Sequence, residues 1–195
     1  MPRELVMVGV SAGGLDAVCV LLGRLPDDFG MPIVVVQHRS KDSDALCEVL
    51  QDCTRMSIHE VTDKVSMEPG NVYLAPPDYH LLVEEGYFSL STDAPEMYSR
   101  PSIDVAFESA ADAYGPRVVG VVLTGANHDG ARGLRHIADR GGAVLVQDPR
   151  TAEVAVMPTA ALRAVPEAEV LTLEGIAARL VALQASPAAP GEKRR

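Results

Sequence analysis

Residues 5–14 have the sequence Leu-Val-Met-Val-Gly-Val-Ser-Ala-Gly-Gly, an apolar run followed at once by a serine among glycines. A continuous apolar run that ends in a glycine-rich turn is typical of a buried strand leading into a helix. Residues 9–13 also fit the G-x-S-x-G pattern of hydrolases, in which the turn lifts the serine hydroxyl above the strand end. A phosphate-binding turn would look similar, and Ser11 could simply cap the helix. The stretch predicts the start of an α/β fold and leaves the role of Ser11 open.

Apolar strands and helical patterns alternate along nearly the whole chain, which is typical of a wound α/β sheet. Glu85-Gly86 separates two further strands and predicts an antiparallel hairpin. We therefore predict an α/β fold: a doubly wound, mostly parallel sheet with helices on both faces and one antiparallel hairpin. The expected strands cover residues 5–10, 33–37, 57–61, 71–74, 80–84, 87–91, 118–123, 143–147 and 169–171. The expected helices cover 13–24, 44–53, 102–114, 157–164 and 174–183, with another between the turn at 124–130 and Gly141-Gly142.

Length and composition limit the classes of function. The chain has 195 residues, which fits one domain over 1–185, and its Pro/Ala-rich, charged end over 186–195 predicts a disordered tail. A net charge of −10 argues against nucleic acid as a partner, and no apolar stretch is long enough for membrane insertion. We interpret the three cysteines, Cys19, Cys47 and Cys53, as buried small apolar residues in a reducing compartment. These features predict a cytoplasmic protein.

Three expected strands end in residues that suit acyl transfer. Ser11 follows the first strand, His38 follows the second, and Asp129 lies in the turn after the strand at 118–123. Ligands of open parallel sheets bind beyond the carboxyl ends of the strands, so these side chains are expected at one edge. A hydroxyl nucleophile, a base and a carboxylate that fixes the tautomer of the base form a catalytic triad. The chain order Ser–His–Asp disfavours the α/β-hydrolase fold, which uses Ser–Asp–His.

Other candidate residues have ordinary explanations. His128 is an alternative base beside Asp129, and His80 could border the cleft, although a surface histidine is the default. Asp16 and Asp104 lie in helical patterns, where solvated faces or caps are the default. No H-E-x-x-H pattern or metal-ligand spacing of Cys and His occurs, so no metal site is expected.

Several stretches together resemble the catalytic domain of the chemotaxis receptor methylesterase family (CheB). The motifs occur in the family's order and extend over roughly residues 5–183. They comprise residues 9–14 (Gly-Val-Ser-Ala-Gly-Gly), 36–38 (Val-Gln-His), 71–76 (Asn-Val-Tyr-Leu-Ala-Pro), 100–105 (Arg-Pro-Ser-Ile-Asp-Val), and 122–125 (Val-Leu-Thr-Gly) with 129–131 (Asp-Gly-Ala). Together they are far more specific than any one of them.

The resemblance implies a protein-glutamate methylesterase that removes methyl esters from glutamyl residues on the cytoplasmic helices of chemoreceptors. Family members can also deamidate receptor glutamines. Matched residue by residue, the resemblance implies Ser11 as nucleophile, His38 as base and Asp129 as orienting acid. The backbone N–H groups of Ala12 and Ala126 are then expected to hold the oxyanion. No cofactor is expected.

The sequence also departs from the family pattern. The family often has Thr at the position of Ala12, Met at that of Ala126, and a histidine just before Arg100, which puts substrate preference in doubt. Met1 lies four residues before the first strand, so we expect a stand-alone domain without the family's receiver domain. A separate response regulator as a partner stays open. Two alternatives remain: an esterase for a different substrate, and a non-catalytic module of the same fold that binds receptors.

Overall fold

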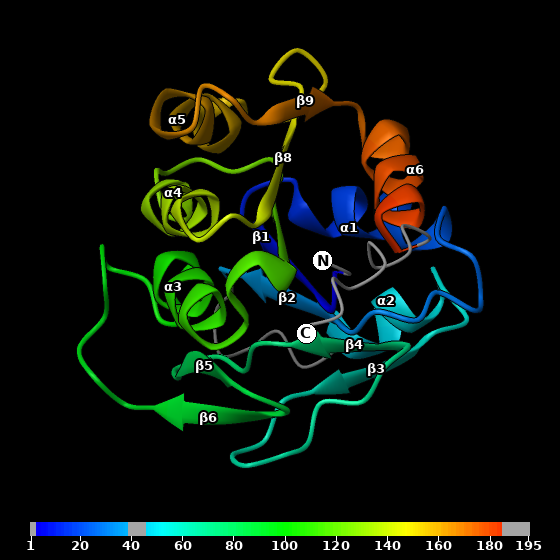
Figure 1. Ribbon diagram of the computed structural model, residues 1–195, viewed down its shortest axis with the longest axis vertical. Helices are drawn as coiled ribbons and strands as arrows, with labels where there is room; N and C mark the ends of the chain where they lie inside the picture. The colour runs from blue at the N-terminus through cyan, green and yellow to red at the C-terminus, as the bar shows by residue number, and fades with distance from the viewer. Residues whose placement is uncertain (1–2, 39–45, 185–195) are drawn as a thin grey trace, which may run out of the picture.

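The computed structural model describes residues 3–38 and 46–184. Its centre is a seven-stranded, fully parallel sheet with the order β3-β4-β2-β1-β7-β8-β9 (Figure 1). The strands are β1 (Leu5–Val10), β2 (Ile33–Gln37), β3 (Ser57–Glu60), β4 (Asn71–Leu74), β7 (Val118–Val122), β8 (Ala143–Gln147) and β9 (Glu169–Leu171). The predicted parallel sheet is confirmed.

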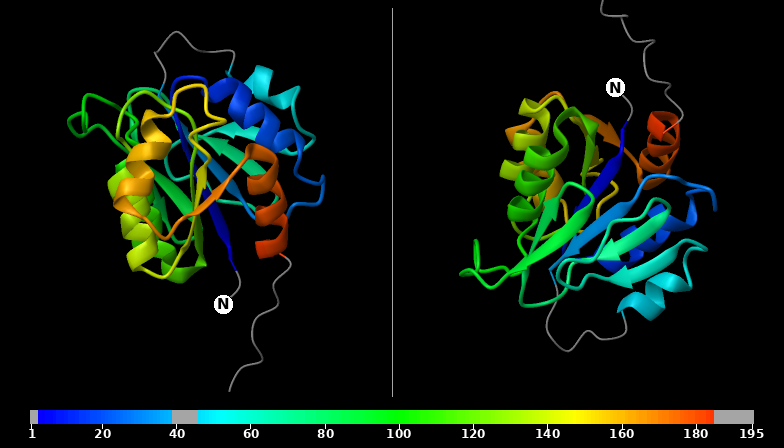
Figure 2. Two further views of the ribbon diagram at one scale, coloured as in Figure 1. Left: turned by 90° about the horizontal axis from the view of Figure 1, so that it is seen from above. Right: turned by 60° about the horizontal axis from the view of Figure 1, so that its bottom comes forward.

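Helices cover both faces of this sheet (Figure 2). The helices α3, α4 and α5 lie on one face, and α1, α2 and α6 on the other. Their bounds are α1 (Gly14–Gly23), α2 (Leu46–Gln51), α3 (Ile103–Tyr114), α4 (Ala131–Asp139), α5 (Val156–Ala164) and α6 (Leu173–Gln184). A 3-10 turn at Gly115–Arg117, which the sequence did not predict, follows α3. The predicted tail at 186–195 and the first residues of the helix expected at 44–53 lie outside the described residues.

The side chains of β1 divide the hydrophobic core in two. Leu5 and Met7 point toward α3 and α4, whereas Val6, Val8 and Val10 point toward α1 and α6. All five are fully buried. A strand covered on both faces must be apolar throughout, which explains why the first strand is a continuous run rather than an alternating one.

The predicted hairpin is also confirmed. The strands β5 (His80–Glu84) and β6 (Tyr87–Ser91) pair antiparallel as a separate two-stranded sheet. Gly86 at its turn has a φ of 86°, a conformation that glycine adopts without strain. Leu81, Val83 and Phe88 pack the hairpin against the core on the α3 face. The hairpin thereby supports the start of α3, next to the site described below.

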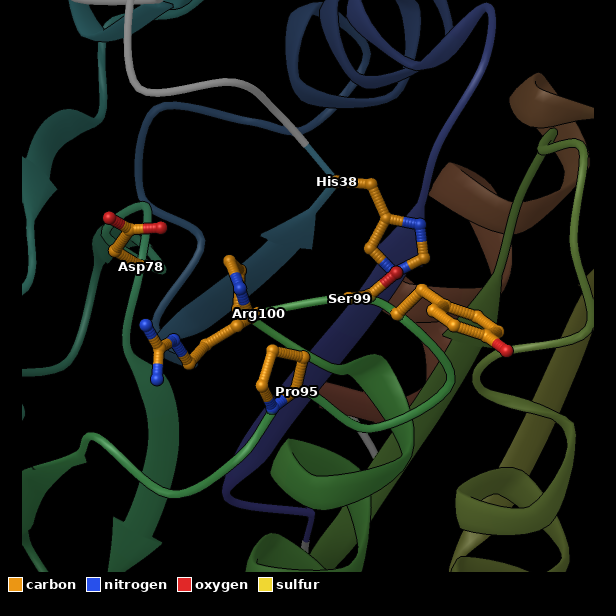
Figure 3. A pocket seen from close by; sticks show the side chains of 7 residues that line it. His38, Asp78, Pro95, Ser99 and Arg100 are labelled. Carbon is orange, nitrogen blue, oxygen red and sulfur yellow. The ribbon is translucent and has the colours of Figure 1, made fainter.

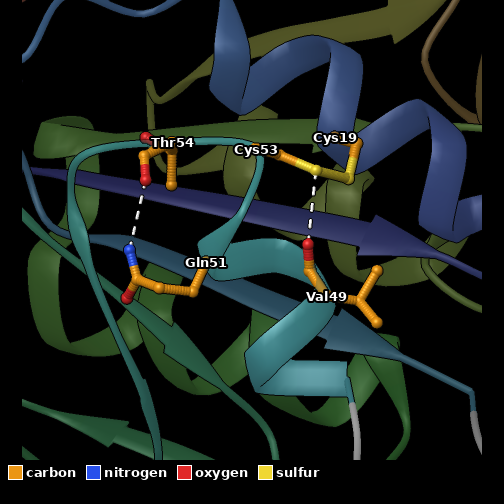
Figure 4. Close-up of a disulfide and its surroundings, with 5 residues drawn as sticks. All are labelled: Cys19, Val49, Gln51, Cys53 and Thr54. Atoms are coloured by element: carbon orange, nitrogen blue, oxygen red, sulfur yellow. Dashed lines mark hydrogen bonds between the residues drawn. A yellow bond between two sulfur atoms is a disulfide. The ribbon is translucent and has the colours of Figure 1, made fainter.

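The interpretation of the three cysteines as buried residues is wrong: Cys47 is half-buried, and the other two are bonded to each other. Cys19 on α1 and Cys53, just after α2, form a disulfide (Figure 4). The helices α1 and α2 bring their Cα atoms to 5.2 Å although 34 residues separate them in sequence. Both residues are half-buried rather than buried. Since disulfides are rare in reducing compartments, the cysteines give no support for a cytoplasmic location. None of the described helices is both long and apolar enough to cross a bilayer.

Candidate active site

The central strands β2, β1 and β7 are neighbours, and their carboxyl ends meet at one edge of the sheet. Backbone hydrogen bonds continue beyond the strands: the N–H of Ser11 donates to Thr124 O (3.0 Å) and that of His38 to Val10 O (3.3 Å). From β1 the chain continues to β2 on one side of it, and the later strand β7 pairs with the other side of β1. Open α/β sheets bind ligands where the strand order changes direction in this way, beyond the carboxyl ends of the strands.

Two glycines, one in the turn that carries Ser11 and one in the turn after β7, allow the close backbone packing around Ser11. Gly13 has a φ of 72°, and a Cβ there would lie 2.6 Å from a carboxylate oxygen of Glu153. At Gly125 a Cβ would collide with the Met157 sulfur and lie 2.9 Å from the Ser11 Cβ. The backbone of residue 125 can therefore approach Ser11 closely only because it is glycine.

The imidazole of His38 joins Ser11 to Asp129. The Ser11 hydroxyl lies 3.2 Å from Nδ1 of His38, and Nε2 of His38 lies 2.7 Å from Oδ2 of Asp129. Because a carboxylate only accepts, Nε2 carries the proton and Nδ1 presents a lone pair to the hydroxyl. In the Ser-His-Asp template the two ring nitrogens have the opposite assignment. His128, the alternative base, is exposed, and His38 is the one histidine of the described residues within hydrogen-bond distance of the Ser11 hydroxyl.

Asp129 is 1% exposed and accepts four hydrogen bonds. Its Oδ2 accepts from His38 and from the N–H of Ile103 (2.7 Å); its Oδ1 accepts from the Ser102 hydroxyl (3.0 Å) and the N–H of Asp104 (2.8 Å). Burial alone would raise the pKa of Asp129, but the bonds from His38 and from the N–H groups of Asp104 and Ile103 outweigh it. The pKa of Asp129 therefore lies below its usual range, and the group stays ionised.

Asp104 makes the reciprocal contact. Its Oδ1 accepts from the N–H groups of Gly130 (2.9 Å) and Gly133 (2.7 Å), so the first turn of α3 holds the first turn of α4. Asp104 is 2% exposed, so the prediction that it lies on a solvated face is wrong. The alternative prediction, that it caps a helix, is confirmed, and the helix is α4. Burial raises the pKa of Asp104 to about 6, and the nearby charge of Asp129 acts in the same direction. Asp16 is exposed, as expected.

His80 is a further correction, because it is 2% exposed and not a surface histidine. Its Nδ1 accepts from the N–H of Ser102 (3.3 Å) and its Nε2 donates to Ala94 O (3.0 Å). His80 thus links the hairpin to the cap of α3. Apart from the position of His80 at the start of a strand, no sequence pattern indicated this role.

Asn127 is a site residue that the sequence analysis missed. Its Nδ2 lies 3.1 Å from Nδ1 of His38, and its Oδ1 accepts from the N–H of Asp129 (3.1 Å). The amide therefore contacts the same lone pair as the Ser11 hydroxyl. The sequence feature that could have indicated Asn127 is its position in the turn after β7, two residues before Asp129.

Ala12 and Ala126, the candidate oxyanion donors, are both exposed. Among the described residues neither backbone N–H has a hydrogen-bond acceptor. The Thr124 hydroxyl fixes the backbone beside them, because it donates to Ala12 O (2.9 Å) and accepts from the N–H of Val154 (2.9 Å). In the described part of the chain no three His, Cys, Asp or Glu side chains are grouped to hold a metal ion.

A pocket of about 440 Å³ opens beside His38 (Figure 3). His38 and Asp78 lie on opposite sides of it, with Ser99 and Arg100 between them. The remaining lining residues are Pro95, Tyr98 and Pro101. The pocket is therefore built largely from the loop that precedes α3, and a ligand there has direct access to the imidazole.

Comparison with known proteins agrees with this geometry. Residues 6–180 match the family model of the CheB methylesterase. A relative from Leptospira interrogans is 46% identical over 185 residues, and the match covers 94% of this chain and 96% of the relative. Its name is putative protein-glutamate methylesterase/protein-glutamine glutaminase. The protein-glutamate methylesterase FrzG of Myxococcus xanthus is 40% identical over 182 residues. That match covers 92% of this chain but 54% of FrzG.

A solved structure has the same fold. The CheB methylesterase catalytic domain of Thermotoga maritima superposes with a TM-score of 0.88 at 30% sequence identity, over 94% of this chain and all of that domain. The same family is indicated by the fold, by the motifs at the strand ends and by the match over nearly the whole chain. This chain belongs to the CheB methylesterase family.

Proposed function

We propose that this protein is a serine esterase that hydrolyses glutamyl methyl esters of chemoreceptors, with Ser11 as nucleophile, His38 as base and Asp129 as the orienting acid. The observation that carries the proposal is the unbroken series of hydrogen bonds from Ser11 through His38 to Asp129. It lies at the strand ends, beside an open pocket.

Acylation follows from the positions of these atoms. The Ser11 oxygen attacks the ester carbonyl while Nδ1 of His38 takes the hydroxyl proton. The carboxylate of Asp129 stabilises the imidazolium that forms, and its three other hydrogen bonds hold it in place. Collapse of the tetrahedral intermediate breaks the bond to the methoxy oxygen, which leaves as methanol with the proton from His38. The glutamyl group is then esterified to Ser11.

Deacylation repeats the same proton transfers with water. His38 takes a proton from a water molecule as its oxygen attacks the acyl group, and then returns the proton to the Ser11 oxygen as the bond breaks. The products are methanol and a glutamate side chain. The N–H groups of Ala12 and Ala126, with no other acceptor among the described residues, would stabilise the oxyanion in both steps.

The substrate and its location are part of the proposal. The relatives with methylesterase names support a methylated protein, and the wider family supports the cytoplasmic helices of chemoreceptors. The name of the Leptospira relative adds glutamine deamidation, which the same nucleophile would perform with ammonia as the leaving group. We propose a cytoplasmic protein, with a separate response regulator as its source of regulation.

Labelling with a fluorophosphonate tests the nucleophile. We expect one covalent adduct on the peptide that contains Ser11, lost in Ser11→Ala and retained in Ser57→Ala, a change at an exposed serine of β3. Peptide mass spectrometry locates the adduct. An adduct on Ser99, the serine that lines the pocket, or no adduct at all in the wild-type protein, would contradict the proposal.

A further inference from the structure

The loop before α3 contains a tight turn with an unusual sequence. Glu96 and Ser99 exchange two backbone hydrogen bonds, of 3.1 and 2.9 Å, around the central pair Met97 and Tyr98. Both central residues have positive φ, 48° and 65°. A two-residue turn with positive φ at both positions favours Asn-Gly or similar pairs. A bulky residue in this conformation costs on the order of 1–3 kcal/mol.

Packing within the chain does not compensate for this cost. The exposed fraction is 103% for Tyr98 and 49% for Met97. Tyr98 is thus fully exposed and Met97 about half exposed, and neither side chain belongs to the buried core. Such strain is concentrated at functional sites, and large exposed aromatic residues are favoured where proteins bind partners.

The rest of the loop holds the turn in a fixed position. Arg100 donates to the carbonyl oxygens of Thr92 (2.9 Å) and Asp93 (3.0 Å). At the turn itself, Glu96 pairs with Arg132 of α4 (3.1 Å), which also pairs with Glu108 of α3 (2.7 Å). These contacts connect the turn to α3 and α4.

The turn borders the pocket beside His38. Tyr98 and His38 both line this pocket, and the His38 imidazole contacts the Ser11 hydroxyl, so a protein segment bound in the pocket lies against Tyr98 and next to the candidate base. On a helix, side chains three or four residues from the ester lie on the same face, about 5–6 Å away. An apolar side chain at such a position can contact the turn while the ester reaches the nucleophile.

We propose that Met97 and Tyr98 determine specificity for a protein substrate by binding the apolar face of its methyl-accepting helix. This inference rests on the proposed function and adds the part of the enzyme that distinguishes a helical protein substrate from a small ester. The strain of the turn is then the cost of exposing two apolar side chains beside the base.

The double variant Met97→Asn/Tyr98→Gly tests the inference. It removes both side chains and installs the pair that this turn prefers, so its thermal midpoint should equal or exceed that of the wild-type protein. We expect kcat/KM for a methylated receptor fragment to fall about tenfold more than kcat/KM for a small ester such as p-nitrophenyl acetate, mainly through KM. Tyr87→Ala, which removes an exposed tyrosine of β6 outside this pocket, is the matched control.

The outcomes separate the two proposals. Equal losses for the two substrates, or no loss for the receptor fragment, would overturn the specificity role while leaving the esterase in place. A similar loss in Tyr87→Ala would also overturn it. If the wild-type protein releases no methanol from the receptor fragment although it hydrolyses the small ester, the proposed substrate is wrong and this inference fails with it.

Discussion

The carboxylate of Asp129 accepts four hydrogen bonds, three of them from residues at the start of α3. One donor is the imidazole of His38, one the hydroxyl of Ser102, and two are backbone N–H groups at the start of α3. A helix N-terminus favours negative charge, so α3 acts together with the bond from His38 to keep this group ionised. Asp129 is thus also held by three bonds that do not involve His38.

Asp129→Asn should therefore affect both turnover and stability. Whichever oxygen becomes an NH₂ group, it faces one backbone N–H, of Ile103 or of Asp104, that loses its acceptor, which costs about 1–3 kcal/mol of unfolding free energy. Turnover should fall by roughly 10⁴-fold, because His38 loses control of its tautomer. Steady-state kinetics and urea denaturation measure the two effects. Asp16→Asn, at an exposed position of α1, is the control, and wild-type turnover in Asp129→Asn would remove Asp129 from the triad.

The helices α3 and α4 are joined by two aspartates, each of which accepts hydrogen bonds from the first turn of the other helix. Asp129, just before α4, accepts from the first turn of α3, and Asp104, in that first turn, accepts from the N–H groups of Gly130 and Gly133. The two buried carboxylates have opposite pKa shifts, since the pKa of Asp104 rises to about 6 and that of Asp129 is lowered. The arrangement keeps Asp129 ionised at the expense of Asp104.

The variant Asp104→Asn tests the raised pKa of Asp104 through the pH dependence of the unfolding free energy. Between pH 3.8 and 6 the folded protein keeps a proton on Asp104 that the unfolded chain has released, so stability falls as pH rises. The variant has no carboxyl proton at this position, and its amide oxygen can still accept from Gly130 and Gly133. From pH 4 to pH 7 the unfolding free energy of the wild-type protein should therefore fall by about 2 kcal/mol relative to the variant. Urea denaturation at both pH values measures this, and a constant difference would contradict it.

For the whole molecule, the sequence predicted the central strands closely because buried parallel strands are continuous apolar runs. The strands β1, β2, β4, β5, β6, β8 and β9 have the predicted bounds. Ser11, His38 and Asp129 could be grouped because each follows a strand, and strand ends of a parallel sheet share an edge.

The features that the sequence did not predict depend on distances between elements. The disulfide between Cys19 and Cys53 requires that α1 lies beside the end of α2, which no local pattern reveals. The burial of His80 and Asp104 depends on how the hairpin and α4 pack around the start of α3. Asn127 contacts His38 only because β7 and β2 lie on either side of β1.

Release of methanol from a methylated chemoreceptor fragment is the most direct test of the proposed function. With labelled methyl esters, the wild-type protein should release methanol and leave glutamate at the modified positions, and Ser11→Ala should release no more than the uncatalysed reaction. Equal release by the wild-type protein and Ser11→Ala, or none by the wild-type protein, would contradict a serine esterase acting on glutamyl methyl esters.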